Sequence, residues 1–219
     1  MDEGQQIDCT ICGLAFVDDS GPVGTPQAVA EPVVMTGTDA LKERYLKNKN
    51  TINIIGPCGK LYRKQLWDDT RFTNGIYYED LDIAPYIFTK CRNVFCIPEI
   101  GYFYYQRTGS ASHGEGTDDK RYLDSLKIRE KHIAFYDEHS LPEISVVVRK
   151  MLMELIITSS CNGWIPVSAR AYSKKLFAKT YYSLFLSGDI SLKDKLRFSL
   201  YKIGGRYIYG WATQKKQKR

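Results

Sequence analysis

The chain has 219 residues, of which 43% are hydrophobic and 26% are charged, so it can form one well-packed domain or a domain with a helical appendage. Its longest apolar stretches, such as residues 144–148 and 155–157, fall far short of the roughly 20 residues that cross a membrane. The first residues carry neither the basic nor the apolar pattern of a secretory leader. We therefore expect a cytoplasmic protein without a transmembrane segment.

The net charge of +6 is concentrated at the C-terminal end. Residues 189–219 hold nine Lys or Arg and two Asp, a difference of +7, so the rest of the chain is close to neutral. In this tail leucines alternate with basic residues, and Tyr207, Tyr209 and Trp211 follow. Such a pattern favours a basic amphipathic helix on an anionic membrane surface, on the inner face of the cell membrane. A packing helix with a loose basic end is the alternative.

The chain is rich in tyrosine and contains six cysteines. Tyrosine suits contacts with sugars, bases or protein interfaces, although half-buried positions on amphipathic elements are the better explanation. Cys9 and Cys12 have zinc-site spacing but lack a second ligand pair, so a buried strand is the better interpretation. Basic and aromatic residues are not interleaved as in a nucleic-acid-binding module, so no nucleic acid partner is expected.

The N-terminal part mixes strand and helix patterns in chain order. Ile7, Cys9 and Ile11 share one face of a strand, and Thr38 or Asp39 is placed to cap a helix. The expected elements are a buried strand over 5–17, a surface loop over 18–32, a helix over 38–46, a short helix over 60–67 and a helix from 77 to about 90.

The next residues change from a strand pattern to a helical one. Residues 94–97 and 101–105 are β-type runs joined through Pro98 and Glu99, which predicts a hairpin or two adjacent strands. Beyond Gly116 the spacing predicts helices over 122–138, 144–159, 172–186 and 192 to about 201. The sequence therefore predicts an α/β fold over residues 1–116 and a helical region over 117–219.

Short motifs follow one another in a fixed order between residues 56 and 113. Gly-Pro-Cys-Gly-Lys-Leu-Tyr-Arg-Lys at 56–64 precedes Arg71-Phe72, Gly75, Glu79-Asp80, Tyr104-Tyr105-x-Arg107 and Gly109-Ser110-x-Ser112. This ordered set resembles the second half of an inverting family-2 glycosyltransferase with the GT-A (nucleotide-diphospho-sugar transferase) fold. That family's pattern runs lysine-leucine-tyrosine, arginine-phenylalanine, glutamate-aspartate, tyrosine-tyrosine, arginine, serine. The resemblance covers about residues 5–113 and implies the acceptor side of that fold.

The resemblance assigns the chemistry to the acid pair. In an inverting transfer a sugar hydroxyl attacks the anomeric carbon while a carboxylate takes its proton. The resemblance places this general base at Asp80, with Glu79 orienting the acceptor or the base. A helix N-terminus favours an ionised carboxylate, as a proton acceptor requires. The alternative is that both are first-turn charges on a solvated helix.

Further site residues follow from the resemblance alone. Arg107 would pair with the donor diphosphate and His113 would complete a metal shell, while Lys60, Tyr62 and Ser110 would contact substrate. A solvated histidine and a helix-surface lysine are the alternatives for His113 and Lys60.

The triplet Asp80-Leu81-Asp82 is not the family's metal motif, which closes the nucleotide-binding half upstream of the strand at 5–17. The resemblance therefore implies that this half is supplied by missing sequence and that the chain alone is inactive. The complete enzyme is expected to use a nucleotide-sugar donor with Mn²⁺ or Mg²⁺.

The expected function is the acceptor half of a sugar-nucleotide-dependent inverting glycosyltransferase. Its acceptor would be a saccharide or a lipid-linked sugar in surface polysaccharide synthesis. The alternative is a non-catalytic acceptor-binding or membrane-surface scaffold of the same fold.

Overall fold

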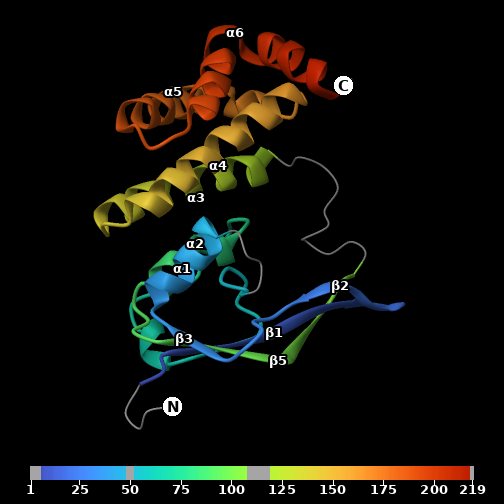
Figure 1. Ribbon diagram of the computed structural model, residues 1–219, viewed down its shortest axis with the longest axis vertical. Coiled ribbons are helices and arrows are strands. Elements are labelled where there is room, and N and C mark those ends of the chain that lie inside the picture. The colour runs from blue at the N-terminus through green and yellow to red at the C-terminus, as the bar shows by residue number, and fades with distance from the viewer. Residues whose placement is uncertain (1–5, 48–51, 108–118, 218–219) are drawn as a thin grey trace. The chain divides into compact units, whose positions relative to one another are not determined.

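The computed structural model describes residues 6–47, 52–107 and 119–217, with the backbone alone at residue 206 and at 208–217. The chain divides into two compact units, Met1–Gly116 and Thr117–Arg219. A curled sheet with two helices forms the first, the sheet unit, and helices form the second, the helical unit (Figure 1). The predicted α/β class and the helical C-terminal region are thus confirmed.

A mixed sheet is the frame of the sheet unit. Its central strands, β1 and β5, run parallel, and β2 and β4 pair antiparallel with β1 while β3 pairs antiparallel with β5. The side chains of Cys9, Ile11 and Leu14 in β1 are buried. The strands of the described residues are β1 (Cys9–Asp18), β2 (Gly21–Gln27), β3 (Val33–Met35), β4 (Lys60–Tyr62) and β5 (Val94–Tyr105).

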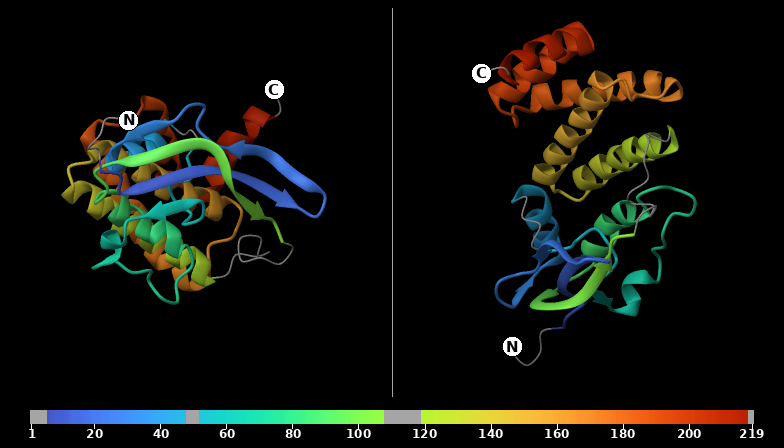
Figure 2. Two further views of the ribbon diagram at one scale, coloured as in Figure 1. Left: turned by 90° about the horizontal axis from the view of Figure 1, so that it is seen from below. Right: turned by 90° about the vertical axis from the view of Figure 1, so that its right-hand side faces the viewer.

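Two helices, α1 (Gly37–Leu46) and α2 (Glu79–Phe88), lie on one face of this sheet (Figure 2). Thr36 caps α1, because its hydroxyl accepts a hydrogen bond from the backbone N–H of Asp39 at 3.0 Å. Gly37 lets α1 approach the end of α2, since a Cβ there would lie 1.8 Å from the carbonyl oxygen of Phe88. The helix therefore begins one residue before the predicted start, and its cap is Thr36.

Two predicted elements of the sheet unit are wrong. Residues 21–27 form an edge strand rather than part of a loop, because the Asp18–Gly21 turn, closed by a 2.8 Å bond from Ser20 N to Asp18 Oδ1, returns the chain along β1. An edge strand tolerates the Gly and Pro residues that predict a loop. Residues 60–67 are not one helix: Lys60–Tyr62 pairs with β1 and Lys64–Trp67 forms a 3-10 turn.

The two β-type runs expected at 94–97 and 101–105 are one continuous strand, β5. Pro98 suggests a break because it has no N–H to donate to a neighbouring strand. In the structure the pairing of β1 with β5 shifts register between Ile11 and Leu14, opposite this segment. Such an irregularity accommodates a proline within a sheet, so no turn is needed.

The helical unit packs around its own apolar core. Its helices are α3 (Asp119–Glu138), α4 (Pro142–Cys161), α5 (Arg170–Ser187) and α6 (Leu192–Gln217). Each predicted helix has its counterpart here, because helical periodicity over ten or more residues is a strong signal. The core includes Leu126, Leu152, Met153, Ile156, Leu176 and Phe198.

Helix α6 continues beyond the predicted end at about residue 201, but it is not a straight rod. Gly205 has φ 54° and ψ −150°, which are not helical angles, so two helical segments meet there. In the part of the chain that the structure describes, every helix is too short or too polar to cross a bilayer.

Candidate functional site

The acidic pair predicted as catalytic lies at the very start of α2. Tyr78, the residue before the helix, has the left-handed angles φ 62° and ψ 38°, which are uncommon for a residue other than glycine. Glu79 is exposed and Asp80 is partly exposed. The backbone N–H of Leu81 donates to Asp80 Oδ1 at 2.7 Å, which leaves Oδ2 as a second acceptor atom. The left-handed backbone of Tyr78 thus sets the direction in which the chain passes from the preceding loop into the first turn of α2, where the acidic pair lies.

Asp82, the third acid of the first turn, has a different position. Its side chain is 3% exposed, and Thr73 Oγ1 donates to its Oδ2 at 2.7 Å. Its backbone N–H also bonds to Tyr78 O at 2.9 Å. Asp82 therefore holds the loop before the helix in place, while Asp80 stays accessible to a substrate.

Lys60 is within electrostatic reach of Asp80. It opens β4, where it pairs with Ile11 of β1, and its Nζ donates to Gly56 O. Burial lowers the pKa of Lys60 to about 8, and the negative charge of Asp80 acts in the opposite direction. At neutral pH Lys60 remains mostly protonated, so the structure brings a poorly hydrated cation toward the acidic pair.

The loop before Lys60 is held by residues that the motif comparison overlooks. Asn53 Oδ1 accepts from Gly56 N at 3.0 Å, and Cys12 N donates to Gly59 O at 3.0 Å. Gly59 has φ 69°, and a Cβ there would lie 3.4 Å from both Cys12 Sγ and Tyr102 Cβ. The Gly-Lys dipeptide of the motif is thus explained by a close approach to β1 and β5 that favours glycine.

Tyr62 lies in the same strand as Lys60, two residues further along β4, whereas Arg107 follows the far end of β5. Tyr62 packs edge-on against Trp67 with ring centroids 5.4 Å apart, and burial raises its pKa. Arg107 is exposed and follows β5, whose last residue pairs with Val17 of β1. Since Lys60 pairs with Ile11, six residues earlier on β1, Tyr105 lies roughly 20 Å along the sheet from Lys60, and Arg107 follows two residues further on. Ser110 and His113 are outside the described residues.

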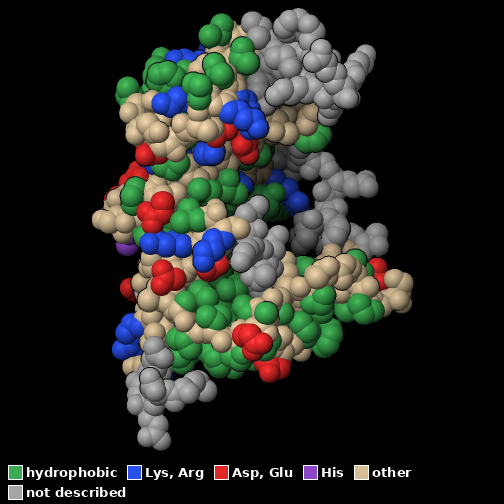
Figure 3. Space-filling view, viewed as in Figure 1, with side chains coloured by type: hydrophobic (Ala, Val, Ile, Leu, Met, Phe, Trp, Pro, Cys, Tyr) green, Lys and Arg blue, Asp and Glu red, His purple; other side chains and the backbone are tan. Residues whose placement is uncertain are grey.

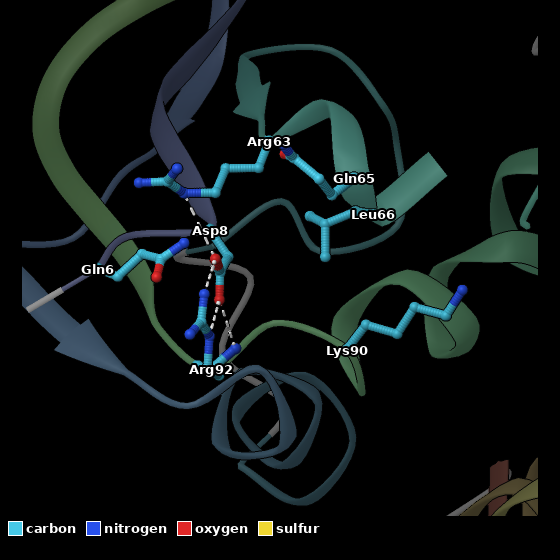
Figure 4. Close-up of a pocket in the computed structure, with 7 residues that line it drawn as sticks. All are labelled: Gln6, Asp8, Arg63, Gln65, Leu66, Lys90 and Arg92. Carbon is cyan, nitrogen blue, oxygen red and sulfur yellow. Dashed lines mark hydrogen bonds and ion pairs between the residues drawn. The ribbon is translucent and has the colours of Figure 1, made fainter. Parts of the chain in front are cut away.

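A pocket of about 360 Å³ lies beside the start of β1, where the carboxylate of Asp8 sits between the guanidinium groups of Arg63 and Arg92 (Figure 4). Arg92 donates to Asp8 through Nε and Nη2, both at 3.1 Å, and through its backbone N at 2.9 Å. The hydrogen bond from Arg92 holds the pKa of Asp8 below its usual range. Lys90 extends away from this cluster and pairs with Asp69.

This pocket is structural rather than catalytic. Both arginines are engaged by the buried Asp8, and Arg63 Nε also donates to Ile7 O at 2.6 Å, so they tie the start of β1 to β4 and to the segment before β5. Lys90 lies just past the C-terminal end of α2, about 15 Å along the helix from Glu79. The acidic pair is therefore a separate site at the other end of α2.

Comparison with protein-family models gives no match, and no curated protein is significantly similar to the chain. Function is therefore inferred from the chain's own residues and from the order of its motifs.

Proposed function

We propose that the chain forms the acceptor side of an inverting family-2 glycosyltransferase with the GT-A fold, and that Asp80 is its general base. The observation that carries this proposal is that two aspartates in the first turn of α2, Asp80 and Asp82, differ in exposure. Asp82 is buried and engaged by Thr73, whereas the neighbouring Asp80 is accessible and faces the field of Lys60. A carboxylate kept accessible at a helix N-terminus, beside a cation, is suited to accept a proton.

In the proposed reaction the acceptor hydroxyl gives its proton to a carboxylate oxygen of Asp80. The hydroxyl oxygen attacks the anomeric carbon of the donor sugar, and the bond from that carbon to the nucleoside diphosphate breaks. The diphosphate leaves with the electron pair, and the configuration at the anomeric carbon inverts. Glu79 would orient the acceptor, and Lys60 would supply positive charge near Asp80.

In this proposal the described residues do not supply the donor side of the reaction. Within residues 6–47, 52–107 and 119–217, no group of three or more His, Cys, Asp or Glu side chains is placed to hold a metal ion. The described residues therefore do not fit a divalent ion. The nucleotide-binding half, Mn²⁺ or Mg²⁺ and the diphosphate contact of Arg107 belong to the complete enzyme in this proposal.

The reaction is tested with the complete enzyme, supplied with a panel of uridine and guanosine diphosphate sugars and with saccharide and lipid-linked acceptors. We expect release of nucleoside diphosphate that depends on acceptor, and a product whose anomeric configuration, read by NMR, is opposite to that of the donor. Retained configuration would contradict the proposal, and so would a panel in which no donor yields a product.

A further inference from the structure

The first segment of α6 has apolar side chains on two opposite sides. Phe198 is fully buried in the helical core and Tyr201 packs against Phe177 at 4.9 Å. At about 100° per residue, Leu192, Leu196, Leu200 and Ile203 fall on the other side of the helix, within about 80° of one another. These four side chains are exposed, Leu192 to 73% and Ile203 to 82%.

A surface helix normally turns polar residues outward, so this outward apolar stripe needs a separate explanation. The last turns of α5 extend it. Tyr182 and Phe185 are exposed, and Lys202 Nζ lies 3.7 Å from the ring centroid of Tyr182 while Lys195 Nζ lies 5.4 Å from that of Phe185. We name this surface the α5–α6 face: Tyr182, Phe185, Leu192, Leu196, Leu200 and Ile203.

Basic side chains border the α5–α6 face on both sides, and the exposed Asp189 lies in the segment between the two helices. Lys195 and Lys202 border the stripe on the side of α5, and Lys193 borders it on the other side. Figure 3 shows hydrophobic side chains interspersed with basic ones over α5 and α6. Asp194, an acid of the same helical segment, points toward α4 and pairs there with Lys150 at 2.8 Å.

We propose that the α5–α6 face binds the surface of an anionic bilayer, with α6 lying parallel to it. Leu192 to Ile203 span about 17 Å of helix, and such a stripe can enter the headgroup boundary while lysine stems lie along it and their ammonium groups reach the phosphates. Charge complementarity selects an anionic bilayer as the occupant. The face ends at Gly205, where the helix breaks, so the proposed docking surface lies before the terminal basic run.

The test is co-sedimentation of the full chain with vesicles of phosphatidylcholine containing about one third phosphatidylserine. Ile203→Glu should weaken binding at least about tenfold, because it places a charge in the stripe and repels the anionic surface. Leu61→Glu is the matched control: Leu61 is 78% exposed but lies in the sheet unit, and binding should stay within about twofold. Lys195→Gln and Lys202→Gln should each weaken binding about fivefold.

Three outcomes would overturn the proposal. The first is unchanged binding by Ile203→Glu with an unaltered circular dichroism spectrum. The second is loss of binding on deletion of residues 206–219 while Ile203→Glu still binds, which would place attachment in the basic end. The third is a vesicle-free dimer that Ile203→Glu dissociates, which would assign the face to a second copy of the chain. The assay contains no sugar, so its outcome is separate from that of the transfer reaction.

Discussion

Each unit contains a departure from the usual distribution of residues, and the two departures differ in kind. In the sheet unit, ionised groups are taken into the fold: Asp8 and Asp82 are 5% and 3% exposed, and Lys60 is desolvated enough to lower its pKa. In the helical unit, an apolar stripe is turned outward along α6. A buried charge needs a partner and an exposed stripe needs a cover, so each departure indicates a specific role.

The largest expected effect separates the core of the helical unit from its surface. Leu152 is fully buried in that core, so Leu152→Ala should lower the free energy of unfolding by about 2–5 kcal/mol. Met151, the preceding residue, is 39% exposed, and Met151→Ala should cost less than about 1 kcal/mol. Urea denaturation followed by circular dichroism measures both, and equal losses would contradict the assigned orientation of α4.

The next effect concerns the buried charge at the start of β1. Asp8→Ala removes three hydrogen bonds from Arg92 and should cost about 2–3 kcal/mol in the free energy of unfolding. Asp69→Ala breaks the exposed pair with Lys90 and should cost under about 1 kcal/mol.

The ion pair of Asp8 with Arg92 should also affect the stability of the protein at low pH. Because the pKa of Asp8 is lowered in the fold, its contribution is present above about pH 4 and is lost as the pH falls below that value. Asp8→Ala should therefore flatten the acid limb of a plot of stability against pH. An unchanged acid limb in this variant would exclude Asp8 as its source.

A third effect appears in alkali, where the buried thiols of the sheet unit titrate. Burial raises the pKa of Cys91 to about 12 and of Cys96 to about 11, so only the unfolded chain loses these protons as the pH rises above 9. The Cys9 thiol, whose pKa burial also raises, makes a third, and the depressed pKa of Lys60 offsets one of the three, so stability should fall by about 2.7 kcal/mol per pH unit from there. Lys60→Met should make the fall steeper, and a shallower fall would contradict the assigned burial.

The smallest expected effect on stability belongs to the α5–α6 face. Ile203→Glu should change the free energy of unfolding by no more than about 0.5 kcal/mol, because the side chain contacts mainly solvent. Phe198→Ala, on the opposite side of the same helix, should cost about 3–5 kcal/mol. A large loss in Ile203→Glu, measured by thermal denaturation, would show that the stripe is packed rather than free.

The sequence predicts local patterns well and distant contacts poorly. The long helices and the acidic first turn of α2 follow from spacing within one segment. The strand at Gly21–Gln27 and the continuity of β5 through Pro98 depend on pairing with β1, which propensity does not report. The pair of Asp8 with Arg92 joins residues 84 positions apart, and only the fold shows it.

The candidate site divides in the same way. Motif order predicts Glu79 and Asp80, and the left-handed Tyr78 is the local feature that it misses. The sequence gives no sign that Lys60 is partly buried, since that follows from its pairing with β1 and from the loop held by Asn53. Nor does the sequence show that Asp82 is buried while Asp80 is accessible, because the contact of Asp82 with Thr73 depends on the tertiary structure.

The most direct test of the central claim is the turnover number of Asp80→Asn in the complete enzyme. We predict a fall in kcat of roughly 100-fold or more with donor affinity nearly unchanged, the behaviour of a lost general base. Asp68→Asn makes the same chemical change at an exposed aspartate of the sheet unit and should leave kcat within about twofold. A kcat in Asp80→Asn equal to that of the control would remove Asp80 from the mechanism.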